Sequence, residues 1–362
     1  MEKKWRKSLL LLGLLIIQII GFKILFSSDK VVEFIVNNFT FPVSGQIAKI
    51  TNSVPFPLGE LFYLIISIIG FYLIVKLIFC IIKKHSELSN SLSNVLLFIN
   101  LCFLVYNFAW GVMYNKESLT FDKELIKIDP KILKQIYCSE SEKAIYYRNL
   151  LNNNDNELIK YQSTLEDFNQ EFEQLQYSFK NINWLKNYRF LEKHQYKLSY
   201  ISSIQNHIGI LGYYNPFTVE ANLNRFNTNL KQPSTMFHEY GHMMGFASES
   251  EANFLAYYLG SQSKNIEVQY SVHYKSLFSL LGAISKTDPF FVKMELNNLH
   301  PKIKLDRKAE IDYYAKFEGE ISDTFSEINN QFLKANNQEG TISYSKYVEL
   351  IYYLYTTKNG TN

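Results

Sequence analysis

The sequence predicts a mostly α-helical α+β fold in which three N-terminal transmembrane helices precede one larger polar domain. Long apolar runs fill the first third of the 362 residues, and apolar residues at helical spacing dominate the remainder. One short segment of β-forming residues precedes a helix that carries two histidines. We expect the membrane region to occupy residues 1–114 and the second domain to occupy residues 115–362.

Each of the three apolar runs has about the length that crosses a hydrocarbon core of roughly 30 Å. The first run has no small-x-small cleavage site behind it, which favours a retained anchor over a signal peptide. The third contains Asn100 and Asn107, whose amides should face other helices because they are costly in lipid. Soluble domains seldom contain several such runs, so we predict transmembrane helices at residues 8–26, 61–82 and 95–113.

Basic residues at the ends of these runs predict the orientation in the membrane. Such residues mark cytoplasmic flanks, and Trp110 and Tyr114 are suitable interfacial anchors after the third run. With three spans, the second domain should then lie on the extracytoplasmic side. The residues that carry this prediction precede the first run and follow the second: Lys3, Lys4, Arg6, Lys7, Lys83 and Lys84.

Charge and cysteine content exclude several classes of protein. The net charge of +3 is small, and no basic cluster with interleaved aromatic residues appears, so we expect no nucleic-acid partner. Of the three cysteines, Cys80 and Cys102 lie in apolar runs, which leaves only Cys138 in the second domain. A disulfide framework or a cysteine-rich zinc site is therefore excluded there. Histidine and carboxylate side chains must hold any metal ion.

In the second domain, residues 208–224 combine β-forming residues with Gly212 and Pro216, which predicts a short strand or hairpin. The next segment contains His238, Glu239 and His242 in an H-E-x-x-H arrangement. On a helix the two histidines are one turn apart and reach one zinc ion. Glu239 lies on the adjoining side, where it can accept a proton as a general base.

The ends of this helix are also indicated. Ser234 or Thr235, which follow Pro233, can cap its N-terminus, and Gly245 suits its C-terminus. Further helical patterns follow from about Ala252, Tyr270, Ala309 and Tyr344, with Pro289, Pro301 and Gly340 as breakers between them.

A catalytic zinc site needs a third protein ligand and an open fourth position. A second helix beginning after residues 246–248 would return Glu249 to the two histidines. Glu251 is the alternative third ligand, but it lies about 200° around the helix from Glu249. Asn253, one turn after Glu249, could orient a ligand imidazole. The metzincin pattern would require a histidine at Ser248, so that class is excluded.

The two segments together resemble the gluzincin zinc peptidases, in which an E-x-x-A-D/N helix follows the H-E-x-x-H helix. More closely, the chain resembles a family of bacterial membrane proteins known as domain of unknown function 3810. This resemblance rests on four further segments: Pro55-Phe-Pro-Leu-Gly-Glu60, Trp110-Gly111, Asn215-Pro-Phe-Thr-Val-Glu-Ala-Asn222 and Phe332-Leu-Lys-Ala-Asn336.

The gluzincin resemblance implies one Zn²⁺ ion, a peptide or protein substrate, and hydrolysis by a zinc-activated water with Glu239 as general base. It also implies that a strand before the zinc helix pairs with the extended substrate, here around Tyr213, Tyr214 and Asn215, although a plain structural hairpin is an equal alternative. The side chain that would stabilise the oxyanion stays open among Tyr213, Tyr214, Tyr257, Tyr313, Tyr314, His273 and His300.

Two other functions compete with this prediction. The first is a catalytically inactive zinc-binding scaffold that organises partners in the lipid bilayer. A purely structural zinc site has no need of Glu239 and usually closes its fourth position with protein, which disfavours it. The second is cleavage inside the bilayer, which is disfavoured because the motif lies more than a hundred residues beyond the last apolar run, in polar sequence.

Overall fold

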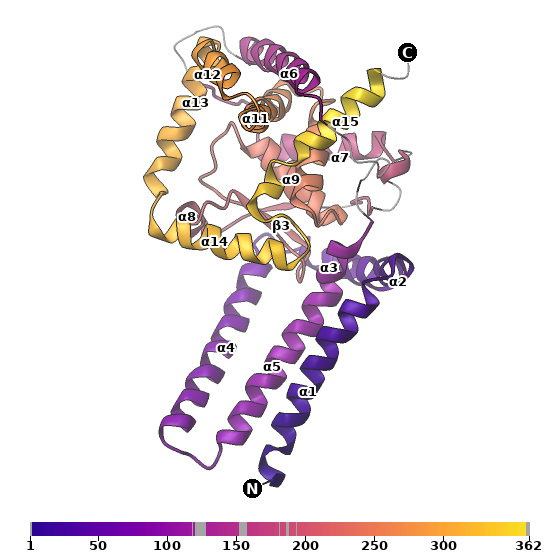
Figure 1. Ribbon diagram of the computed structural model, residues 1–362, viewed down its shortest axis with the longest axis vertical. Helices are drawn as coiled ribbons and strands as arrows, with labels where there is room; N and C mark the ends of the chain where they lie inside the picture. Colours follow the sequence, from indigo (N-terminus) through magenta and orange to yellow (C-terminus); the bar gives the residue numbers. More distant parts are fainter. Residues whose placement is uncertain are drawn as a thin grey trace. The chain divides into compact units, whose positions relative to one another are not determined.

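The computed structural model describes residues 2–117, 119, 128–151, 158–180, 182–185, 188–192 and 194–359. The protein is mostly helical and contains a small three-stranded sheet (Figure 1). It divides into two compact units: Met1–Glu117 with Asn215–Glu220, and Ser118–Tyr214 with Ala221–Asn362. The sequence-based division had placed residues 215–220 in the second domain, whereas in the structure they group with the first unit.

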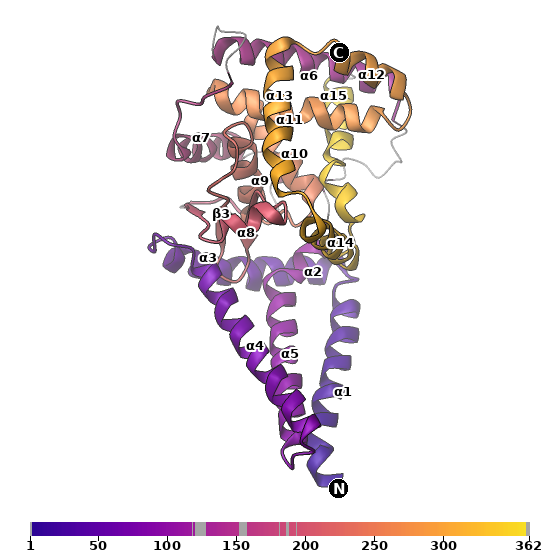
Figure 2. The same ribbon diagram turned by 90° about the vertical axis from the view of Figure 1, so that its left-hand side faces the viewer.

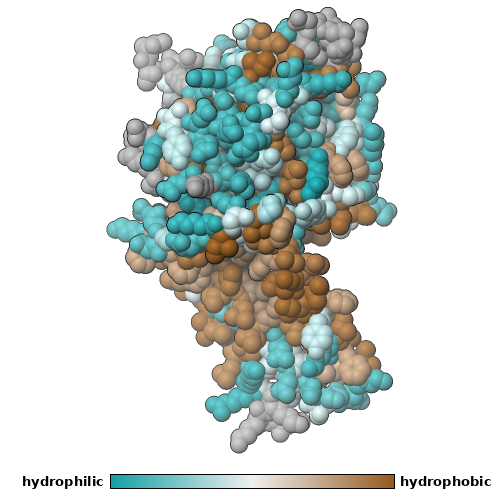
Figure 3. Space-filling model, turned by 180° about the vertical axis from the view of Figure 1, so that it is seen from behind, coloured by the Kyte–Doolittle hydropathy of each residue, from teal (hydrophilic) through white to brown (hydrophobic). Residues whose placement is uncertain are grey.

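Three helices of the first unit are long and apolar enough to cross a membrane: α1 (Glu2–Leu25), α4 (Leu58–Ile82) and α5 (Leu88–Ala109). They lie side by side, with α5 packed against both α1 and α4 (Figures 1 and 2). Large apolar side chains stay exposed along them, and Figure 3 shows hydrophobic side chains gathered over this part of the molecule. This composition matches helices whose solvent is lipid.

Polar side chains join α1 to α5. The Ser8 hydroxyl bonds to the Ser89 carbonyl at 3.1 Å, and the Gln18 amide donates to Asn100 Oδ1 at 3.2 Å. Asn100 Nδ2 also donates to the Leu11 carbonyl at 3.1 Å. The prediction that Asn100 faces another helix is confirmed, since interhelical hydrogen bonds satisfy amides that lipid cannot.

The third apolar helix differs from its prediction at both ends. It begins at Leu88 and stops at Ala109, because Trp110 leaves the helical conformation with φ −143°. Residues Gly111–Asn115 then form the 3₁₀ helix η2. The predicted span began later because the first turns of α5 are rich in serine and asparagine and have low hydropathy. Buried serine hydroxyls in these turns bond to α1 and α4.

Between the first two apolar helices the structure contains three segments that sequence analysis missed. These are α2 (Asp29–Ile35), the π-helix η1 (Val36–Thr40) and α3 (Phe41–Thr51). Their apolar residues are interrupted by lysines and asparagines and do not form a long run. They were missed because a search for long apolar runs passes over short mixed helices.

Two of the segments that carry the family resemblance meet in the first unit. The Glu220 carboxylate accepts hydrogen bonds from the backbone N–H groups of Leu58 (3.1 Å) and Gly59 (2.6 Å) at the start of α4. A carboxylate is stabilised there by the unpaired N–H groups and the helix dipole. A Cβ on Gly59 would lie 2.3 Å from Asn215 Nδ2, so any larger residue there would displace the Asn215 side chain.

The second unit is built around α9 (Gln232–Met244), α10 (Glu249–Gly260) and α11 (Ile266–Ile284). These three helices pack on one another, and α6 (Pro130–Leu151) packs on α11. Nearly every residue of α9 and α10 is buried, so these helices form the core. The remaining helices are α7 (Leu165–Ser178), η3 (Asn183–Leu185), α8 (Ser202–His207), α12 (Pro289–Asn297), α13 (Pro301–Tyr314), η4 (Ala315–Phe317), α14 (Glu320–Ala335), η5 (Gly340–Tyr344) and α15 (Tyr347–Asn359).

The small sheet has the strand order β1-β3-β2, so that β2 lies at one edge. Its strands are β1 (Tyr196–Leu198), β2 (Gly212–Asn215) and β3 (Glu220–Leu223). The predicted strand pair is confirmed by β2 and β3. Strand β1 was not predicted, because it is only three residues long and pairs in parallel with a distant segment, Tyr196 lying opposite Ala221.

Candidate metal centre

Helix α9 carries the H-E-x-x-H segment and differs from its prediction at the N-terminus. The helix begins at Gln232 after Lys231, with no side-chain cap, so the predicted capping by Ser234 or Thr235 is wrong. Pro233 allows this earlier start because a proline suits the first helical turn, where its missing N–H costs nothing. The predicted end is confirmed, since Gly245 closes the helix in the left-handed conformation with φ +107°.

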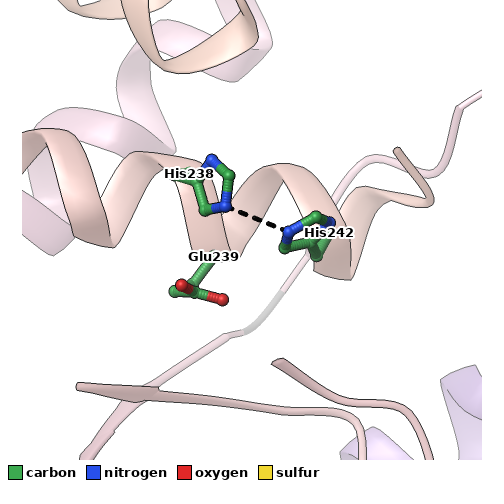
Figure 4. Close-up of side chains that lie close together, drawn as sticks. All are labelled: His238, Glu239 and His242. Carbon is green, nitrogen blue, oxygen red and sulfur yellow. Dashed lines mark hydrogen bonds between the residues drawn. The ribbon is translucent and has the colours of Figure 1, made fainter. Parts of the chain in front are cut away.

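The two histidines of α9 face each other across one helical turn. Their Nε2 atoms lie 3.1 Å apart (Figure 4). Glu239 projects from the neighbouring side of the same helix, with a carboxylate oxygen within 4.8 Å of the histidine nitrogens. Both imidazoles and the carboxylate are buried. The helix thus brings two imidazole nitrogens and the Glu239 carboxylate close together.

A third donor comes from the first residue of α10. Glu249 Oε2 lies 3.1 Å from His238 Nε2 and 3.5 Å from His242 Nε2. A tetrahedral ion with bonds of about 2.0–2.1 Å separates its ligand atoms by about 3.3 Å. The three spacings bracket this value, so the atoms stand where ligands of one small cation would stand.

Several polar atoms of this cluster have no ordinary hydrogen-bond partner. His238 Nδ1 and Glu239 Oε2 are buried and make no hydrogen bond to the residues that the structure describes, while the buried Glu249 Oε2 has the two imidazoles as its near neighbours. Buried polar atoms without partners are costly, and a buried carboxylate is costly unless a cation or hydrogen-bond donor compensates it. A bound divalent cation would remove that cost, and the donor set therefore fits zinc.

The turn between α9 and α10 holds one of the imidazoles in position. The Phe246 carbonyl lies 2.6 Å from His242 Nδ1, which directs Nε2 toward the cluster. The rings of Phe246 and Tyr188 stack at 3.6 Å. Arg189 donates to the carbonyls of Met243 (2.6 Å) and Met244 (3.0 Å) at the end of α9. Sequence analysis missed Tyr188 and Arg189, because both are distant in sequence from the motif.

Glu251 and Asn253, the other two candidate site residues on α10, have different partners. Glu251 Oε1 accepts a hydrogen bond from the Leu119 N–H at 2.6 Å, away from the histidines. Asn253 Oδ1 accepts from Lys275 Nζ at 2.6 Å. The predicted role of Asn253 as the group that orients an imidazole stays a prediction; the Phe246 carbonyl lies against His242 Nδ1, and His238 Nδ1 has no described partner.

Burial and mutual contact set the charges of the cluster in the metal-free protein. Burial raises the pKa of Glu239 to about 8 and lowers the pKa of His238 to about 4. Burial alone would lower the pKa of His242, but the adjacent Glu249 carboxylate raises it to about 9. Conversely, burial alone would raise the pKa of Glu249, and the two imidazoles hold it well below its usual range. Glu249 is therefore the anion of the group.

The edge strand β2 lies against Glu239. A Cβ placed on Gly212 would come within 3.0 Å of Glu239 Oε1 and of Thr235 Cγ2, so only glycine fits there without a shift. The backbone N–H of Tyr214 bonds to the Glu239 carboxylate, and its hydroxyl bonds to Arg189. The predicted substrate segment of Tyr213, Tyr214 and Asn215 is thus a strand, and its second-unit residues lie beside Glu239.

Most other candidates for oxyanion stabilisation have partners elsewhere. Tyr257 and His273 both contact Glu140, at 2.9 and 2.6 Å. Tyr313 donates to the Phe226 carbonyl at 2.5 Å and Tyr314 to Asn227 at 2.9 Å, while His300 lies at the start of α13. Tyr213 and Tyr214 are the candidates whose strand lies beside Glu239.

Comparison with known proteins identifies one family. The family described as Protein of unknown function (DUF3810) matches residues 37–352, which include α4, α5, the sheet and the helices of the candidate metal centre. No curated protein and no solved structure matches the chain.

Proposed function

The chain belongs to the DUF3810 family of proteins of unknown function, and we propose that it is a membrane-anchored, zinc-dependent peptidase of the gluzincin kind. The observation that carries the proposal is the convergence of His238 Nε2, His242 Nε2 and Glu249 Oε2 beside the Glu239 carboxylate. The direct test is hydrolysis of a peptide mixture by the full-length protein in detergent micelles. Activity should be abolished by a chelator and restored by zinc.

The donor set favours zinc. Two imidazoles and one carboxylate are a donor set of catalytic zinc sites, and three protein ligands leave a fourth position open for a reactant. When bound, such an ion supplies Lewis acidity at that open position. A purely structural zinc site would have no need of a buried carboxylate such as Glu239 beside the ligands.

Glu239 would move the proton in this reaction. In its ionised form it accepts a proton from the attacking water and later donates that proton to the leaving amine. The Tyr214 N–H bond to its carboxylate fixes its orientation. The edge strand β2 would bind an extended peptide through main-chain hydrogen bonds, with Gly212 letting that strand lie close to Glu239.

Zinc binding should release protons at neutral pH. In the metal-free protein, burial raises the pKa of Glu239 to about 8, and Glu249 raises that of His242 to about 9 against the effect of burial, so both groups carry protons at pH 7. A ligand imidazole must lose its proton to bind, so zinc affinity should rise with pH between about 6 and 9, by up to about tenfold per unit for each proton released.

Titration calorimetry in two buffers of different ionisation enthalpy measures this release directly. The apparent binding heat should differ between the buffers at pH 7, in proportion to the number of protons released. A heat that does not depend on the buffer at pH 7 would contradict the assigned protonation states.

We also propose that the spans place the second unit outside the cytoplasm, because the basic flanks lie at the N-terminus and after the second span. Cys138 of α6 is an exposed thiol of the second unit. A membrane-impermeant maleimide should therefore label it in intact cells, and Cys138→Ser should abolish the label. Labelling only after the cells are broken open would reverse the proposed orientation.

A further inference from the structure

A cavity of about 260 Å³ lies in the second unit, lined by residues of α9, α11 and α13 and by Leu211, Leu230 and Lys231. Its charged lining residues are Lys231, Lys275, Arg307 and Glu310, so cations outnumber carboxylates three to one. We call it the cationic pocket. Sequence analysis gave no sign of it, since its charges come from three separate segments.

The cationic pocket lies next to the candidate metal centre. Thr235 lines it and is one helical turn before Glu239 on α9. Thr235 and Glu239 both pack on Gly212 of β2, and the preceding residue, Leu211, also lines the pocket. On the other side, Lys275 donates to Asn253, one turn after Glu249 on α10. A peptide that follows β2 past Glu239 would therefore pass the mouth of this pocket.

The single carboxylate of the pocket cannot satisfy all of its donors. Glu310 accepts from Arg307 at 2.7 Å and from the Tyr274 hydroxyl at 2.6 Å, and pairs with Lys231 at 2.6 Å. Glu310 is itself almost fully buried, while the side chains of Lys231 and Arg307 are 31% and 37% exposed. Lys275 has a neutral amide as its hydrogen-bond partner. Positive charge and N–H groups thus remain available to a ligand in the pocket.

We propose that the cationic pocket binds a carboxylate of the peptide substrate, next to the bond that is cleaved; this rests on the proposed peptidase function. The volume is below the roughly 300–1,000 Å³ of sites for drug-sized ligands, which suits a single residue. Guanidinium and ammonium donors together form charge-assisted hydrogen bonds to a planar carboxylate. The carboxylate belongs either to an acidic side chain or to the free C-terminus of the peptide, and the two sources are separable by experiment.

The experiment measures binding by fluorescence anisotropy to the full-length Glu239→Gln protein in detergent micelles, so that no probe is cleaved. Three dansylated peptides share one body: Gly-Ala-Phe-Ala with a free carboxylate, Gly-Ala-Phe-Ala amide, and Gly-Ala-Phe-Glu amide. At least one of the two carboxylate probes should bind roughly tenfold more tightly than the neutral amide. The one that does so identifies the source of the carboxylate.

Variants assign the preference to the pocket. Lys231→Gln should remove most of the roughly tenfold preference, and Glu310→Gln should increase it by removing the competing anion. Lys134→Gln is the matched control, because Lys134 pairs with Asp288 at the same 2.6 Å and is also 31% exposed, yet does not line the pocket. Tighter binding in Glu310→Gln is a result that a merely structural role of these residues would not produce.

The outcomes separate this proposal from the peptidase proposal. Equal binding of all three probes, no binding of any probe, or equal effects of Lys231→Gln and Lys134→Gln would overturn the pocket proposal even if the protein contains zinc and cleaves peptides. A carboxylate preference that depends on Lys231 in a protein that binds no zinc would support the pocket and refute the peptidase.

Discussion

Replacement of Glu239 by glutamine should reduce peptide hydrolysis about 10²–10⁴-fold while leaving zinc in place. The amide has nearly the same shape as the carboxyl group but cannot accept and return a proton. Glu239 supplies no donor atom in the proposed ligand set, which consists of His238, His242 and Glu249. The measurement is the initial rate of hydrolysis of one peptide, compared at equal zinc content.

The control for this prediction is the zinc content of the same preparation. If Glu239→Gln keeps its zinc and also keeps its full rate, Glu239 is not the general base, and the proposed mechanism fails. If the variant loses its zinc, Glu239 is part of the ligand set, and the assignment of Glu249 as third ligand must be revised.

The second large effect concerns stability. Arg148 of α6 and Asp306 of α13 form a fully buried bidentate ion pair, with Nε–Oδ2 at 2.5 Å and Nη2–Oδ1 at 3.2 Å. The Tyr270 hydroxyl also donates to Asp306 Oδ2 at 2.7 Å. Arg148→Met would leave a buried carboxylate without its cation and should destabilise the second unit by about 3–5 kcal/mol. Its melting temperature should then fall by about 6–20 °C.

Two comparisons show whether this loss comes from the uncompensated charge. The double variant Arg148→Met/Asp306→Leu should recover part of the lost stability, because replacing a whole buried pair by apolar groups costs less than breaking it. Lys134→Gln breaks a partly exposed pair with Asp288 and should lower the melting temperature much less than Arg148→Met does. A melting temperature unchanged by Arg148→Met would show that the pair does not stabilise the fold.

The parts of the candidate site that sequence predicted are those fixed by short-range helix geometry. The spacing of His238 and His242 places them on one face of any helix, and the 200° between Glu249 and Glu251 separates their directions. In the structure Glu249 lies beside the histidines and Glu251 bonds to Leu119. Gly245 ends α9 in the left-handed conformation, as expected because glycine adopts positive φ without strain.

The parts that sequence did not predict depend on contacts between distant segments. Lys275 of α11, Glu310 of α13 and Arg189 of the segment before β1 are far apart in the chain. Nothing near them in sequence indicates that they approach the α9–α10 turn or the cationic pocket. Strand β1 has too few residues to show a pattern of its own and is defined by its pairing with β3. The α9 N-terminus was misplaced because Pro233 was read as lying before the helix, whereas it occupies the first turn.

The central claim is that His238, His242 and Glu249 hold one zinc ion, and elemental analysis of the purified full-length protein tests it most directly. Wild type, Glu239→Gln and Glu251→Gln should each contain about one zinc per chain, whereas His238→Ala and Glu249→Ala should lose most of it. Absence of metal from the wild type, or zinc retained by Glu249→Ala and lost by Glu251→Gln, would contradict the account.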